Sequence, residues 1–130
     1  MRVLLKYGLL SLLILLMPAA FAQAGDASLA VSPQQAAALH SEKKAVIVDV
    51  REDSEWREQH IPGAIHIPLG ELESRLAELK AHQNGPIITQ CRSGKRSQQA
   101  QQVLKSAGFD KVYNLDGGLI AWDKAGLATE

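Results

Sequence analysis

Residues 90–97 read Gln-Cys-Arg-Ser-Gly-Lys-Arg-Ser and lie between two segments of different character. The run 86–89 before them is mostly apolar and follows a glycine, which is typical of a short strand. Residues 97–108 after them carry alanine, valine and leucine at helical spacing, with Gly108 placed to end the helix. A strand, a short loop and a helix in this order predict an α/β fold in which Cys91 follows the end of a strand.

The loop has the composition of an anion-binding site. A cysteine at the start of a helix faces unpaired N–H groups and the positive end of the helix dipole. These groups and three nearby cations favour the thiolate, so the pKa of Cys91 is expected below the free value of about 8.5. They also form a cradle for a small anion. The predicted site consists of a catalytic nucleophile, Cys91, and substrate-binding residues Arg92, Ser93, Gly94, Lys95, Arg96 and Ser97.

A lone cysteine can also be a small buried residue without chemistry. The charged, polar and glycine neighbours of Cys91 suit a core position badly, which favours the nucleophile. The chain has 130 residues, enough for one domain, and its 14 basic side chains equal its 14 acidic ones. This balance gives no reason to expect a nucleic-acid partner.

The N-terminus has the layout of a secretory signal. Two basic residues lie within a start of six, and an apolar run of about eleven residues follows, too short to span a bilayer. Small residues after Pro18 offer a cleavage site. We therefore expect a signal peptide over 1–22, a single domain over 23–130, and a periplasmic or secreted protein, with an uncleaved anchor as the alternative. Export usually accompanies disulfides, so a single unpaired thiol favours a functional Cys91.

The rest of the chain alternates between strand and helix patterns. Residues 26–31 are expected to form a loose leader, and Ser32 to cap a helix that ends near residue 41. Strands are expected over 45–50, 65–67, 86–89 and 111–115, and further helices over 52–59, 70–82, 97–108 and 119–122. This order predicts a parallel central sheet with helices on both faces.

Ligands bind beyond the carboxyl ends of the strands in such folds, and two such ends carry functional candidates. Cys91 follows one strand, and Asp49 and Arg51 lie at the end of another. We expect Asp49 and Arg51 to support the loop through an ion pair or a backbone hydrogen bond, or to form a solvated pair at the strand end.

Four stretches, in order, resemble the motifs of a single-domain rhodanese, a sulfurtransferase. They are Val48 to Glu52 with the following Glu55-Trp56, His60 to Pro68, Cys91 to Arg96, and Gly117 to Trp122. Gln59 departs from the glycine that the family often has there. With the signal peptide, the layout is similar to that of the small periplasmic phage-shock-type rhodaneses.

The resemblance implies a two-step reaction. Cys91 takes the outer sulfur of thiosulfate, sulfite leaves, and the persulfide passes its sulfur to cyanide, a thiol or a protein acceptor. The loop N–H groups and cations suit the thiosulfate dianion. No cofactor is implied, and the four histidines lack metal-ligand spacing, so no metal is expected.

Two other functions use a similar loop. A non-enzymatic persulfide carrier or sensor would need the same residues, so the sequence does not separate it from the enzyme. A cysteine phosphatase or arsenate reductase has a Cys-x5-Arg loop, whereas Arg96 comes one residue early here. Such an enzyme also needs an acid for the leaving group, and residues 79–109 contain no Asp or Glu.

Overall fold

The computed structural model describes residues 29–130, so the predicted signal peptide lies outside the described residues. Within this range the chain forms a five-stranded sheet whose strands are all parallel, in the order β1-β5-β4-β2-β3. The parallel sheet predicted from the alternating pattern is confirmed. The strands are β1 (Ala30–Val31), β2 (Val46–Asp49), β3 (Ile65–His66), β4 (Ile87–Gln90) and β5 (Val112–Leu115).

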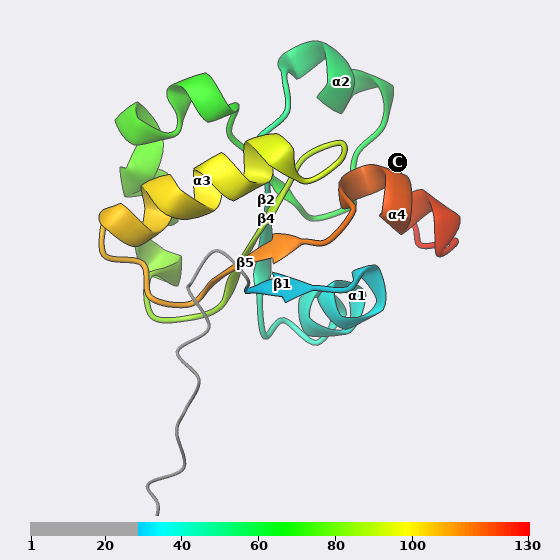
Figure 1. The fold of residues 1–130 in the computed structure, drawn as a ribbon, viewed down its shortest axis with the longest axis horizontal. Coiled ribbons are helices and arrows are strands. Elements are labelled where there is room, and N and C mark those ends of the chain that lie inside the picture. Colours follow the sequence, from blue (N-terminus) through cyan, green and yellow to red (C-terminus); the bar gives the residue numbers. More distant parts are fainter. Residues whose placement is uncertain (1–28) are drawn as a thin grey trace, which may run out of the picture.

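Helices cover both faces of the sheet (Figure 1). The α-helices are α1 (Pro33–Ser41), α2 (Asp53–Glu58), α3 (Lys95–Ser106) and α4 (Gly118–Lys124), and the 3-10 helices are η2 (Leu69–Glu71) and η3 (Glu73–His82). None of the helices within residues 29–130 has the length and apolar character needed to cross a membrane. The expected cap of α1 is present, since Ser32 accepts a hydrogen bond from the Gln35 backbone and the Gln35 side chain accepts one from Ser32.

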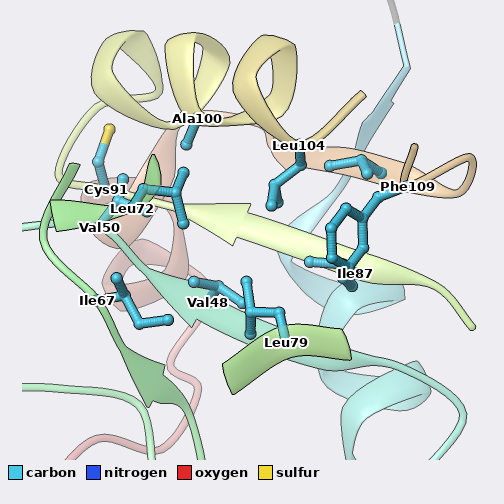
Figure 2. Packing of buried hydrophobic residues seen from close by; sticks show 11 residues of the cluster. Val48, Val50, Ile67, Leu72, Leu79, Ile87, Cys91, Ala100, Leu104 and Phe109 are labelled. Carbon is cyan, nitrogen blue, oxygen red and sulfur yellow. The ribbon is translucent and has the colours of Figure 1, made fainter. Parts of the chain in front are cut away.

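The central strands are buried on both faces because successive side chains point to opposite sides. Val48 and Ile87 belong to the apolar cluster beneath α3 and η3, and Figure 2 shows them facing Leu104 and Leu79. Ile47 and Ile88, their neighbours in sequence, belong instead to the cluster that contains Ala36 of α1 and Trp122 of α4. The near-continuous apolar runs of the sequence therefore correspond to strands covered from both sides.

Two expected elements were wrong. Residues 26–31 were expected to be a loose leader, but Ala30 and Val31 form an edge strand that pairs with Asn114 and Leu115. Residues 70–82 were expected to form one amphipathic helix, but they fold into 3-10 turns, with a non-helical backbone at Arg75 (φ −115°, ψ 16°). Leu72 and Leu79 are nevertheless fully buried, so the apolar stripe is correct although the helix type is not.

Candidate functional site

Cys91 follows directly after β4, and the loop behind it turns into α3. The helix begins at Lys95, two residues earlier than expected, and Gly94 precedes it with φ +110°. Glycine adopts this conformation readily, whereas other residues rarely do. The sharp turn at Gly94 brings the first N–H groups of the loop and helix around the sulfur.

Several groups of the loop donate hydrogen bonds to the sulfur. The Gly94 N–H lies 3.1 Å from Cys91 Sγ, and the Ser97 hydroxyl lies 3.3 Å from it. Burial raises the pKa of the Cys91 thiol, but hydrogen bonds from the Ser97 side chain and from the N–H groups of Ser97, Gly94 and Ser93 outweigh that effect. The pKa of Cys91 therefore lies below its ordinary value, as predicted, because these hydrogen bonds stabilise the anionic sulfur.

The expectation that Cys91 is unsuited to a core position was wrong. Its side chain is 1% exposed and belongs to the apolar cluster that contains Val50, Leu72 and Ala100. Figure 2 shows Cys91 at the margin of this cluster, with its sulfur directed away from the other labelled side chains and toward the beginning of α3. The strand places the cysteine in the core, and its polar neighbours in sequence belong to the loop that covers the sulfur.

The cations of the loop do not all behave as expected. Arg96 forms a two-pronged ion pair with Glu55 of α2, at 2.7 and 2.9 Å. The hydrogen bonds from Arg96 help to lower the pKa of Glu55 to about 2. Arg96 thus already has a carboxylate partner. The causes that lower the pKa of Cys91 are hydrogen bonds at close range.

Arg92 and Lys95 are exposed, as is Ser93. Arg92 lines a cleft of about 300 Å³ between α2 and α4, which also involves Ile120 and Asp123. The loop thus presents Arg92, the residue after the buried cysteine, to this cleft. The substrate-binding roles of Arg92 and Lys95 stay predictions.

Asp49 and Arg51 form a buried ion pair, not the solvated pair considered as an alternative. Arg51 Nη2 lies 2.7 Å from Asp49 Oδ2, and the two side chains are 5% and 0% exposed. Arg51 also donates to the backbone carbonyl of Gln59 at 2.7 Å and of Glu55 at 3.4 Å. The pair thereby fixes α2, and α2 in turn supplies Glu55 to Arg96. Its support of the loop is indirect.

Three residues that contact the loop were not among the predicted site residues. Glu55 binds Arg96, and Asn114 of β5 contacts both Gly94 and Ser97. Gly118, like Glu55, was recognised only as part of a motif. A Cβ atom there would lie 2.6 Å from the Cys91 carbonyl oxygen. Two N–H groups that follow it hold the loop, because Leu119 donates to Cys91 O and Ile120 to Arg92 O, at 2.9 and 3.1 Å.

The chain is thus a parallel α/β domain with its cysteine in an anion-stabilising loop after β4. Residues 32–125 match the model of the rhodanese-like domain family. The chain belongs to this family.

The relatives that match the chain include proteins with names related to sulfur. The candidate sulfur carrier protein YrkF of Bacillus subtilis is 45% identical over 84 residues, which cover 65% of this chain and 44% of YrkF. An uncharacterized protein of Synechocystis is 33% identical over 108 residues, 83% of this chain and 59% of that protein. The chain therefore spans about half the length of these curated relatives.

Solved structures agree with the fold. The human single-domain sulfurtransferase TSTD1 has a TM-score of 0.67 at 30% identity, with 75% of this chain and 96% of that chain covered. The thiosulfate sulfurtransferase of Pseudomonas aeruginosa has a TM-score of 0.71 at 34% identity, with 78% of this chain but only 20% of that chain covered. The predicted rhodanese-like fold is thus confirmed.

Proposed function

We propose that this protein is a thiosulfate sulfurtransferase that works through a persulfide on Cys91. The Cys91 thiolate attacks the outer sulfur of thiosulfate, and the bond between the two sulfur atoms of thiosulfate breaks. Its electron pair leaves with sulfite, and the outer sulfur stays on Cys91 as an anionic persulfide. Cyanide or a thiolate then attacks this terminal sulfur, takes it, and restores the Cys91 thiolate.

One observation carries this proposal: the sulfur of Cys91 accepts hydrogen bonds from Gly94 N–H and Ser97 O–H at 3.1 and 3.3 Å. Donors fixed around a sulfur stabilise negative charge without reorganising during the reaction. Both the thiolate and the persulfide are anions, and sulfite leaves without a proton. The reaction needs no general acid at the sulfur, and the donors to Cys91 are backbone N–H groups and a hydroxyl.

The test is steady-state turnover of thiosulfate with cyanide, followed as thiocyanate. The wild-type protein is expected to turn over many times, and Cys91→Ser to lose the activity while keeping its fold by circular dichroism. Retained turnover in Cys91→Ser would overturn the proposal. Hydrolysis of an aryl phosphate without thiosulfate turnover would favour the phosphatase alternative.

The predicted anion-binding cations are tested by their effect on KM. Arg92→Ala and Lys95→Ala are expected to raise the KM for thiosulfate more than they lower kcat, because each removes a cation beside the loop. Lys80→Ala is the matched control, since Lys80 is an exposed lysine of η3. An unchanged KM in the loop variants would remove these residues from substrate binding.

A persulfide carrier is the second candidate, favoured by the similarity to YrkF. A carrier would take one sulfur from thiosulfate or from a protein donor and release it only to a partner protein. Stoichiometric loading of Cys91 without turnover with cyanide or small thiols would support this function in place of the enzyme.

We also propose that the protein is exported as a small periplasmic rhodanese of the phage-shock type. The basic start, the short apolar run and the small residues before Gln23 support cleavage after residue 22. Mass spectrometry of the protein from the periplasmic fraction is expected to give an N-terminus at Gln23. Full-length protein found only in the cytoplasm would contradict the export proposal.

A further inference from the structure

Asn114 lies on β5 beside the cysteine loop and contacts two of the residues that donate to the sulfur. Its Nδ2 donates to the Gly94 carbonyl at 3.0 Å, and its Oδ1 lies 2.6 Å from the Ser97 hydroxyl. Gly94 and Ser97 are the residues whose N–H and O–H reach Cys91 Sγ. One amide side chain therefore contacts two residues that donate to the sulfur, Gly94 through its carbonyl and Ser97 through its hydroxyl.

The Ser97 hydroxyl has one proton and two acceptors. Cys91 Sγ lies at 3.3 Å and Asn114 Oδ1 at 2.6 Å, so the shorter contact competes for the same proton. The amide of Asn114 cannot rotate to avoid this competition. Its Nδ2 is bound to the Gly94 carbonyl, and a rotated amide would bring two carbonyl oxygens together. Ser97 itself is fully buried.

The state of the sulfur decides which contact the proton makes. A neutral thiol can donate its own proton to Ser97 Oγ, and the hydroxyl then donates to Asn114 Oδ1. A negatively charged sulfur has no proton to donate and attracts the hydroxyl proton, because hydrogen bonds to ions are stronger than those between neutral groups. Asn114 Oδ1 then gives up its partner.

We propose that Asn114 is a positioning residue of the sulfur site, whose carbonyl holds the Ser97 proton while Cys91 is a thiol and releases it when the sulfur becomes an anion. The Ser97 hydroxyl thereby responds to charge on the sulfur. Where the sulfur anion is the persulfide, this proposal rests on the proposed function. Where the anion is the thiolate, the proposal is independent of that function.

The test measures the thiol pKa of Cys91 from the pH dependence of its alkylation by iodoacetamide. The chain has one cysteine, so the alkylation rate reports Cys91 alone. Ser97→Ala is expected to raise the pKa by about 1, because the thiolate loses a donor. Asn114→Asp is also expected to raise it, since a carboxylate keeps the Ser97 proton and adds a negative charge near the sulfur.

The effects of Ser97→Ala and Asn114→Asp on the pKa of Cys91 are expected to be non-additive. In the Asn114→Asp background the hydroxyl is already held by the carboxylate, so Ser97→Ala should change the pKa by less than about 0.3. In the Asn114→Ala background the sulfur is the remaining acceptor among these groups, and Ser97→Ala should have at least its wild-type effect. The expected effect of Ser97→Ala on the pKa thus differs in order among the wild-type, Asn114→Asp and Asn114→Ala backgrounds, and a uniform loosening of the loop would not produce this order. If one Asn114 variant fails to fold, the other can still be compared with the wild type.

Thr89→Val is the matched structural control. Thr89 is buried and donates to the Ser97 backbone carbonyl at 2.9 Å, so it anchors Ser97 without competing for the hydroxyl proton. The effect of Ser97→Ala should persist in this background. Equal effects of Ser97→Ala in the Asn114→Asp and wild-type backgrounds would overturn the inference. A protein with the expected pKa pattern but no thiosulfate turnover would instead retain the inference and lose the proposed function.

Discussion

Gly118→Ala tests how the cysteine loop is held in place. Gly118 has φ +60°, and an added Cβ would lie 2.6 Å from the Cys91 carbonyl oxygen and would overlap the Arg92 carbonyl. The left-handed backbone alone costs alanine about 1 kcal/mol. Relief of the overlap must move backbone atoms, which adds about 1–3 kcal/mol. Weakening of the Leu119 and Ile120 hydrogen bonds to the loop adds about 1 kcal/mol more.

The expected loss of unfolding free energy is therefore about 3–5 kcal/mol, measured by urea denaturation. Gly126→Ala is the matched control, because Gly126 has φ +70° and no atom within 4 Å of an added Cβ. This control carries only the backbone cost, about 1 kcal/mol. If both variants lost the same free energy, the close approach at Gly118 would contribute nothing and the reasoning would be refuted. Slower alkylation of Cys91 in Gly118→Ala alone would link the lost stability to the loop.

Three further predictions concern the groups that support the site. Glu55 has its pKa lowered to about 2 in the folded protein from an ordinary 4.5. Its ion pair with Arg96 therefore stabilises the fold fully above about pH 4.5 and progressively less as the pH falls toward 2. In urea titrations, Glu55→Gln should flatten this part of the curve of unfolding free energy against pH. A curve parallel to that of the wild type would contradict a stabilising role of the ion pair. Asp49→Ala should lower the unfolding free energy by about 3–5 kcal/mol because it leaves Arg51 buried without its carboxylate, and a loss below 1 kcal/mol by thermal unfolding would exclude that role. Ser32→Ala should cost about 1 kcal/mol through loss of the α1 cap, with no change in Cys91 alkylation.

The sequence was informative where structure depends on local pattern. The apolar run 45–50 predicted β2, and Ser32 with Gln35 predicted the start of α1, because a buried strand and a capping box depend on neighbours in sequence. Cys91 was likewise placed correctly at the end of a strand. Four separated motifs then indicated the rhodanese-like family, which the comparison with known proteins confirmed.

The sequence was uninformative where partners lie far apart in the chain. Arg96 and Glu55 are 41 residues apart, and no spacing rule pairs them. Arg96 was therefore expected to bind an anionic substrate and not a carboxylate of the same chain. The edge strand β1 has two residues and exists because β5 offers it hydrogen bonds, which its own sequence does not show. The leucine stripe of 70–82 fits a 3-10 turn as well as an α-helix, since both place residues three apart on nearly the same side. The burial of Cys91 was missed because the strand sets it, whereas the neighbouring residues belong to the covering loop.

The most direct test is the intact mass of the protein before and after exposure to thiosulfate, with the modified residue located by peptide mapping. The account predicts a gain of one sulfur atom on Cys91, removed again by cyanide with release of thiocyanate. The contradicting result is an unmodified Cys91 in the folded protein at a pH above its thiol pKa, where the sulfur is ionised. That result would exclude sulfur transfer as the function of this site.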